Sequence, residues 1–154
     1  MRILGLDPGL AATGYGVIEG RRLIECGVIV TNLKDDLPER LRQLAQGLEQ
    51  VVRRTRPRRC AVETLFFRAV GAKSVILSAE SRGALLCVLA RHRIPVTELT
   101  PATIKLALTG NGRAAKRQVK FMVRSLLGID GRIHEHAADA LAAACCLSRR
   151  GREI

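Results

Sequence analysis

Apolar residues near the start of the chain fall into three short runs, each about as long as a β-strand. Residues 2–7 (RILGLD) end in an acid, and residues 13–20 and 21–31 give two further runs that meet at Gly20. Consecutive strands joined by a tight glycine turn usually pair in antiparallel fashion. The pattern therefore predicts a meander of three antiparallel strands.

From Leu37 onward the apolar residues recur at steps of four and three, which predicts an amphipathic helix with Pro38 in its first turn and its end before Pro57. Residues 60–65 are a short apolar run interrupted by Glu63, which fits a strand buried beside the first one. The same criteria predict a strand over residues 94–99 and helices over residues 72–92, 101–108, 115–127 and 135–147.

A three-stranded meander followed by alternating helices and strands predicts an α/β fold with a mixed five-stranded sheet flanked by helices. No repeat, low-complexity tract or linker interrupts the sequence, so residues 1–154 are expected to form a single domain. The residues from about 149 onward (RRGREI) are expected to be a frayed basic tail.

Two features of these elements allow more than one explanation. Gly14 and Gly16 share one face of the second strand, where another backbone or a substrate could approach closely, or where the chain forms a bulge or packs tightly. The helix over residues 72–92 is apolar on more than one side, as expected either for contact with a second subunit or for a central position in the monomer.

The charge of the chain indicates its kind of partner. Lys and Arg outnumber Asp and Glu by 26 to 14, and the net charge of +12 suits a polyanion. A membrane is disfavoured because Asp7 and Pro8 interrupt the apolar N-terminus and no secretion or lipidation motif is evident. Nucleic acid is therefore the expected partner.

The cysteines are odd in number, lack CxxC spacing and lie in apolar surroundings, which predicts reduced core residues of a cytosolic protein. They are Cys26, Cys60, Cys87, Cys145 and Cys146. None combines with a histidine at zinc-ligand spacing, so no structural zinc is expected.

Three acids stand where burial of a carboxylate should be costly. Asp7 closes the first strand, Glu63 lies inside the fourth, and Asp139 is on an otherwise apolar helix. If the first and fourth strands are parallel neighbours, their carboxylates meet in the crevice where open sheets usually bind ligands. Carboxylates at such range repel by roughly 4 kcal/mol per pair, a cost that a divalent cation removes. Oxygen ligands favour Mg²⁺ or Mn²⁺ over zinc. Taken alone, each of the three acids is more simply explained as a cap, turn or salt-bridge residue.

The order of elements and acids resembles the RuvC family of Holliday junction resolvases. The resemblance covers nearly the whole chain, in segments ILGLDPGLAATGYGVI, DDLPERL, AVETLFF, the helix with Ser81, Arg82 and Gly83, TPATIKLALTGNGRAAKRQV and HAADALAAA. It implies a ribonuclease H-like fold and a homodimer that nicks two strands of a four-way DNA junction symmetrically, in recombination and repair. It also implies a bacterial cytoplasmic, nucleoid-associated protein that works with a branch-migration helicase of the RuvA and RuvB type.

By position, the metal-binding acids of the family fall on Asp7, Glu63 and Asp139, with two Mg²⁺ ions per site, replaceable by Mn²⁺, and no small-molecule cofactor. The products implied are a 5'-phosphate and a 3'-hydroxyl. The last motif, often DAAD, is HAAD here, and spacing of three puts His136 beside Asp139, so the imidazole is expected to ligate the metal or to handle a proton. Glu135 is the alternative ligand, and a capping or solvated role is the alternative for His136.

The resemblance places functionally important lysines at Lys105 and Lys116, where they are expected to meet the phosphate path. Lys116, Lys120 and Arg124 recur every four residues opposite an apolar stripe, which predicts a basic ridge for phosphate contact, although simple solvation is common for such residues. Phe66 takes the aromatic position of the family, for stacking on unpaired bases, and Phe67 is expected in the core. The arginines of residues 53–59 form either a second DNA-contacting cluster or, more simply, a group of solvated side chains at the end of a helix.

Three other functions remain open from the residues alone. The segment LGLDPGLAATGYG also resembles the phosphate loop of actin-like ATPases and sugar kinases, but those proteins place two such domains around the nucleotide. A related nuclease that cuts structured RNA would use the same acids. A basic DNA-binding module without activity would keep the acids for structural reasons.

Overall fold

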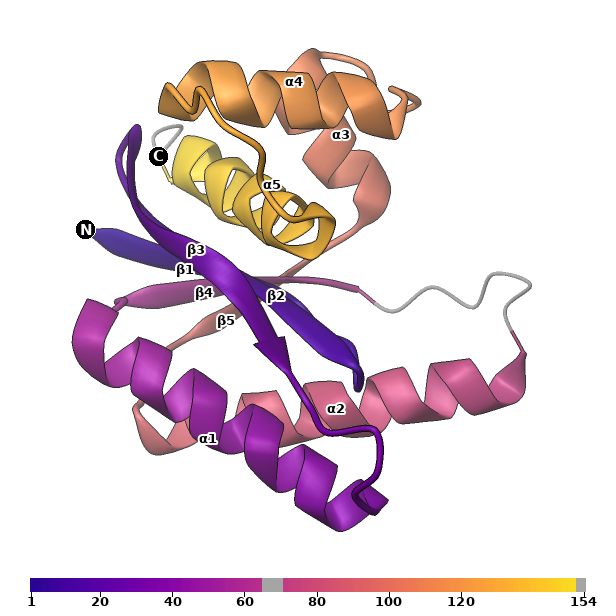
Figure 1. Ribbon diagram of the computed structural model, residues 1–154. Helices are drawn as coiled ribbons and strands as arrows, with labels where there is room; N and C mark the ends of the chain where they lie inside the picture. Colours follow the sequence, from indigo (N-terminus) through magenta and orange to yellow (C-terminus); the bar gives the residue numbers. More distant parts are fainter. Residues whose placement is uncertain (65–70, 152–154) are drawn as a thin grey trace.

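The computed structural model describes residues 1–64 and 71–151, which form a sheet with helices on both faces (Figure 1). Strands β1 (Arg2–Asp7), β2 (Ala12–Glu19) and β3 (Arg22–Val30) form the antiparallel meander. Strand β4 (Arg59–Glu63) pairs in parallel with β1, and β5 (Val96–Leu99) pairs in parallel with β4. The order β3-β2-β1-β4-β5 confirms the predicted mixed five-stranded sheet.

The helices form a layer on each face of the sheet (Figure 1). Helices α1 (Leu37–Thr55) and α2 (Ala72–Arg91) cover one face, and α3 (Pro101–Thr109), α4 (Lys116–Leu127) and α5 (Glu135–Arg150) lie on the other. Neighbouring residues of β1 enter opposite apolar clusters, Leu4 with α1 and α2, and Ile3 with the other three helices. A strand buried on both faces requires this near-continuous apolar sequence.

The predicted element boundaries agree with the structure to within a few residues because physical signals mark them. Helix α1 begins after Asp36, whose carboxylate accepts a hydrogen bond from the N–H of Glu39, and it ends at Arg56, which has the left-handed backbone conformation (φ 49°). Helix α5 continues to Arg150, so the expected tail is partly helical, and residues 152–154 lie outside the described part of the chain.

Helix α5 packs closely on the middle of the sheet, where β1 and β2 each have a glycine at the point of contact. A Cβ atom added to Gly5 would lie 1.8 Å from the carbonyl oxygen of Ala140, and one added to Gly14 would lie 2.0 Å from that of His136. Both distances are far below contact range, so glycine is required at each position. Of the explanations open for Gly14, the close approach of another backbone is therefore correct.

The prediction that all five cysteines are core residues was wrong at one position. Cys60, Cys145 and Cys146 are buried and Cys26 is partly so, but Cys87 is exposed, and none of the five forms a disulfide. Its sequence neighbours are apolar, but the helical rotation turns position 87 away from the side of α2 that is buried on the sheet. Within residues 1–64 and 71–151, no helix has the length and apolar character needed to cross a membrane.

Candidate active site

The sheet brings the first two acids together. Because β1 and β4 run in parallel with Leu6 opposite Val62, the residues that follow, Asp7 and Glu63, stand side by side at the carboxyl ends of adjacent strands. The crevice beyond such strand ends is the usual ligand site of open α/β sheets. The parallel arrangement on which the sequence argument depended is thus present.

Helix α5 brings the other two predicted residues to the same place. Asp7 pairs with Gly14 on β2, and α5 lies directly on Gly14 with the backbone of His136. The Nδ1 atom of His136 lies 2.7 Å from Oδ2 of Asp7, and Asp139 follows one turn later. His134 caps the helix by accepting a hydrogen bond from the N–H of His136, so the capping role belongs to His134.

The charges of the three acids act on one another. Burial raises the pKa of Asp7 above its ordinary value, the hydrogen bond from His136 opposes this increase, and the charge of Asp139 adds to it. Burial also raises the pKa of Glu63, and the charges of Asp7 and Asp139 raise it further. The carboxylates therefore share one crowded, partly dehydrated site whose ionised state is unfavourable without a cation.

Lysines from α4 compensate part of this negative charge. The Nζ atom of Lys116 lies 2.8 Å from Asp139 and 3.2 Å from Glu135, and Nζ of Lys120 lies 2.9 Å from Glu135. Burial lowers the pKa of Lys116, but its hydrogen bonds to Asp139 and Glu135 outweigh that effect and raise the pKa. Hydrogen bonds from both lysines hold the pKa of Glu135 at about 2. Of the two candidates for a fourth ligand, His136 is the one in contact with Asp7.

A cavity of about 420 Å³ opens beside the acids. Glu63 and Asp139 line it together with Thr64, Lys105 and Lys116, so both predicted lysines face the space next to the carboxylates. Thr64 was missed in the sequence, and its hydroxyl oxygen is buried without a hydrogen-bond partner among the described residues. Its position directly after Glu63 was the available signal. Such an orphaned oxygen is expected where a ligand or ion completes the site.

The donor set suits a hard divalent cation in its chemistry. Three carboxylates, an imidazole and the unpartnered Thr64 hydroxyl offer mainly oxygen ligands, and a cation would relieve the repulsion between the acids. In the described part of the chain, however, no three His, Cys, Asp or Glu side chains stand in a ready-made metal-binding geometry. The carboxylates of Asp7 and Asp139 instead contact His136 and Lys116. Ion binding at this site would require some of these contacts to be exchanged for metal bonds.

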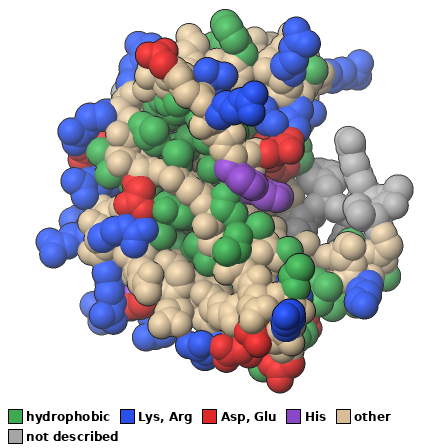
Figure 2. Space-filling model, viewed as in Figure 1, with side chains coloured by type: hydrophobic (Ala, Val, Ile, Leu, Met, Phe, Trp, Pro, Cys, Tyr) green, Lys and Arg blue, Asp and Glu red, His purple; other side chains and the backbone are tan. Residues whose placement is uncertain are grey.

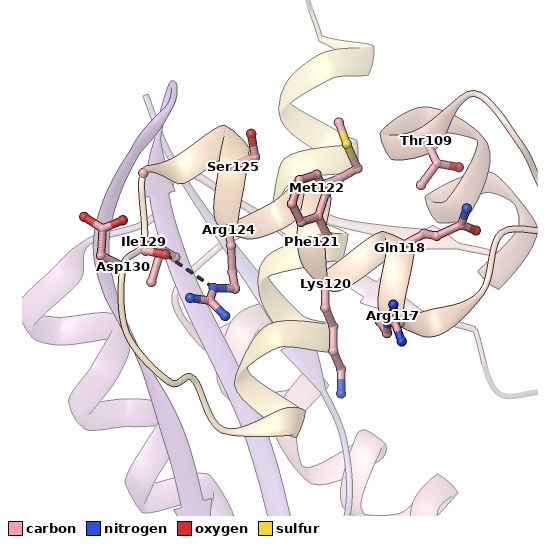
Figure 3. A pocket seen from close by; sticks show the side chains of 11 residues that line it. Thr109, Arg117, Gln118, Lys120, Phe121, Met122, Arg124, Ser125, Ile129 and Asp130 are labelled. Carbon is pink, nitrogen blue, oxygen red and sulfur yellow. Dashed lines mark hydrogen bonds between the residues drawn. The ribbon is translucent and has the colours of Figure 1, made fainter.

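The structure describes the positions of some of the predicted DNA-contact residues and not of others. Phe66 lies outside the described residues, as does Phe67. Lys120 and Arg124 line a second, larger cavity of about 1080 Å³ on the outer side of α4 (Figure 3), where the Nε of Arg124 donates a hydrogen bond to the carbonyl oxygen of Ile129. The view in Figure 2 shows Lys and Arg around most of the visible face, with histidines beside acidic side chains near its middle.

The arginine-rich end of α1 engages structural partners. Arg54 forms an ion pair with Glu25 on β3, and Arg53 forms one with Glu49 on its own helix. Glu25 also accepts a hydrogen bond from the hydroxyl of Tyr15, so Arg54 belongs to a network that joins α1 to the sheet. These two arginines therefore have a role in ion pairs within the chain, which differs from both explanations offered for this cluster.

Comparisons with known proteins show the family of this chain. A family model described as crossover junction endodeoxyribonuclease RuvC matches residues 3–147. The chain is 46% identical to the crossover junction endodeoxyribonuclease RuvC of Bordetella petrii, over 98% of this chain and 85% of that relative. It is 44% identical to the protein of the same name from Treponema pallidum (strain Nichols), over 95% of this chain and 79% of that relative.

Solved structures give the same result. The structure of T. thermophilus RuvC in complex with Holliday junction substrate matches with a TM-score of 0.92 at 33% identity, over 99% of this chain and 96% of that one. The yeast mitochondrial Holliday junction resolvase Ydc2 matches with a TM-score of 0.67, over 96% of this chain and 77% of that one, and at 15% identity it supports the ribonuclease H-like fold alone. By its family model and its relatives, this chain belongs to the RuvC family of crossover junction endodeoxyribonucleases.

Proposed function

We propose that this chain resolves four-way DNA junctions by metal-dependent hydrolysis of two phosphodiester bonds. The observation that carries the proposal is the meeting of acids from β1, β4 and α5 at one edge of the sheet, in a chain that belongs to this family along nearly its whole length. The relatives and the T. thermophilus complex concern DNA, so junction DNA is favoured over structured RNA as the substrate. An inactive binding module is disfavoured because it would not need crowded, buried carboxylates.

Asp7, Glu63, Asp139 and His136 are the residues that we assign to two Mg²⁺ ions, for which Mn²⁺ could substitute. Bound ions of this kind supply an activated water on one side of the scissile phosphate and stabilise the departing 3'-oxygen on the other. Before an ion binds, the imidazole of His136 would hold the carboxylate of Asp7 in place through the contact between Nδ1 and Oδ2. The products would be a 5'-phosphate and a 3'-hydroxyl.

Two lysines are assigned to the phosphate. Lys105 lines the cavity beside Glu63, and its positive charge opposes the increase in the pKa of Glu63. Lys116 balances the charge of Asp139 and would turn to the substrate phosphate when a cation takes over that task. Both residues would thereby offset the charge that develops in the transition state.

A homodimer is proposed because two symmetric cuts require two active sites. Helix α2 offers a contact surface for a second copy, since a stripe of exposed apolar or small residues runs along it: Ile76, Ala79, Gly83, Cys87 and Ala90. A complex with a branch-migration helicase of the RuvA and RuvB type, and a place in the bacterial cytoplasm at the nucleoid, complete the proposal.

The test is cleavage of a synthetic four-way junction labelled on one strand at a time, in Mg²⁺, Mn²⁺ or EDTA. We expect paired, symmetric nicks only with a divalent metal, religatable by DNA ligase, and little cleavage of a linear duplex of the same sequence. Preferential cleavage of an RNA junction would favour the RNA nuclease instead. Failure to cut the DNA junction with any divalent metal would exclude the proposal.

A further inference from the structure

The outer side of α4 exposes an aromatic ring that the candidate active site does not use. Phe121 is 69% exposed, although the helix buries Val119, Val123 and Leu127 on its other side. A single exposed apolar side chain is common on protein surfaces and proves nothing alone. The surroundings of this ring are what set it apart.

Three cationic side chains line the same cavity as the ring. The cavity of about 1080 Å³ on this side of α4 is lined by Phe121 and by Arg117, Lys120 and Arg124, and Asp130 is the single acid among the described residues of its lining. Arg117 and Arg124 lie four residues before and three residues after the ring, the spacings that share one helix face. In Figure 3 the side chains of Arg117, Lys120 and Arg124 extend to one side of the α4 ribbon, and Met122 and Ser125 to the other, with the ring between them.

This surface is continuous with the candidate active site. Glu135 accepts contacts from both Lys116, which also pairs with Asp139, and Lys120, which lines the outer cavity. From Lys116 to Arg124, α4 rises by about 12 Å, the rise of roughly three to four nucleotides in one strand of a duplex. A strand that passes the acids would therefore reach the aromatic ring a few nucleotides away.

We propose that this face of α4 binds a DNA strand of the junction, with Arg117 and Arg124 on its phosphates and the ring of Phe121 stacked on a base. The inference rests on the proposed function and adds a contact at a distance from the cut. Cations that alternate with an aromatic ring match a nucleic-acid strand, whose phosphates and bases alternate in the same way. An acidic peptide would use the cations but offers no comparable partner for the ring.

The chain contains no tryptophan, so Phe121→Trp creates a single reporter at this position. We expect its fluorescence to be quenched when a four-way junction is added in EDTA, because a stacked base quenches the indole. Leu33→Trp, at a site 73% exposed in the segment before α1, is the control and should respond weakly. Binding itself is followed in parallel by gel shift.

Three further variants test the energetics. Phe121→Ala should weaken junction binding at least about fivefold, the lower end of the effect of base stacking on an aromatic side chain. Arg117→Gln and Arg124→Gln should each lower the slope of log affinity against log salt by about 1, since each removes one phosphate contact. Arg42→Gln on α1 removes an equal charge elsewhere and should leave the slope unchanged.

The outcomes separate this inference from the proposed function. Quenching of Phe121→Trp together with weaker binding by Phe121→Ala supports both. Normal junction binding by gel shift, with an unresponsive Phe121→Trp and an unaffected Phe121→Ala, overturns this inference and leaves the proposed function intact. If the unmodified protein does not bind the junction at all, both proposals fall.

Discussion

Among the individual residues of the site, Glu63 is the least compensated. The carboxylate of Asp7 contacts His136, and that of Asp139 contacts Lys116. Burial and the charges of Asp7 and Asp139 raise the pKa of Glu63, and among the described residues the charges of Lys116 and Lys105 oppose this increase. At neutral pH this group therefore opposes folding as long as no cation is bound.

Replacement of Glu63 by Gln should stabilise the metal-free protein at neutral pH. A carboxyl whose pKa is raised in the folded state contributes stability at low pH, and that contribution is lost as the pH rises through the folded-state pKa. Solvent screens part of the repulsion, so we expect the Tm in EDTA at pH 7.5 to rise by only about 2–4 °C. The difference should disappear near pH 4 in thermal unfolding by circular dichroism, and a variant less stable than the parent at both pH values would contradict this view of the site.

His136 should be replaceable by the acid that the family often has at this place. Asp at position 136 would add a carboxylate next to Asp7, so His136→Asp should retain junction cleavage, with changed metal preference. His136→Ala removes the contact to Asp7 and should lower the cleavage rate by about 10- to 100-fold, the usual effect of losing a group that orients a metal ligand. Glu135→Gln is the control, and a larger loss in that variant would make Glu135 the fourth ligand.

At the scale of elements, α5 determines the geometry of the site. It contributes His136 and Asp139, and it can lie over Asp7 only because Gly5 and Gly14 carry no side chain. The same contact explains why a helix rich in alanine is needed here, since small side chains let its backbone approach the sheet. Packing and function are therefore coupled through two glycines.

Gly14→Ala should separate α5 from β2. The new Cβ atom would lie 2.0 Å from the carbonyl oxygen of His136, so the helix start must move, at a cost of about 1–3 kcal/mol in the free energy of unfolding. We expect a lower Tm and, at temperatures where the variant is still folded, a loss of junction cleavage. Gly131→Ala, where no atom lies within 4 Å of the added Cβ, should change neither property.

Most of the elements and the three acids could be predicted from the sequence, because strand length, helix period and cap residues are local signals. The pairing of Asp7 and Glu63 also followed, since it needed only parallel strands. The contacts of Lys116 with Asp139 and Glu135 could not be predicted, because they depend on how α4 packs beside α5. The exposed position of Phe121 outside the apolar stripe of its helix could be read from the sequence. The cavity that it lines with the cations could not, because that cavity depends on how α4 packs against the neighbouring segments.

At the scale of the whole molecule, the chain combines a positive net charge of +12 with one acidic site. The positive surface attracts the DNA backbone in a salt-dependent way, and the acids repel it unless cations are bound. Binding and catalysis should therefore respond differently to metal. The described part of one copy holds one such site, so paired cleavage would depend on the proposed homodimer.

Charge introduced on the exposed stripe of α2 should disrupt the proposed dimer. We expect the parent protein to sediment as a dimer in analytical ultracentrifugation, and Ala79→Glu with Gly83→Glu to sediment as a monomer, because the two copies would place like charges against each other. Gln46→Glu, which adds one negative charge on the exposed side of α1, is the control and should leave the dimer intact. A parent that is monomeric at micromolar concentration, or a double variant that stays dimeric, would place the contact elsewhere or exclude it.

The central claim is that Asp7, Glu63 and Asp139 converge in order to hold divalent cations. The most direct measurement is anomalous diffraction from crystals that contain Mn²⁺ at a concentration that supports cleavage. We predict anomalous density at roughly 2.0–2.6 Å from a carboxylate oxygen of Asp7, the range for hard cations and oxygen, and its absence in Asp7→Asn. Crystals without manganese at Asp7 under these conditions would contradict the account.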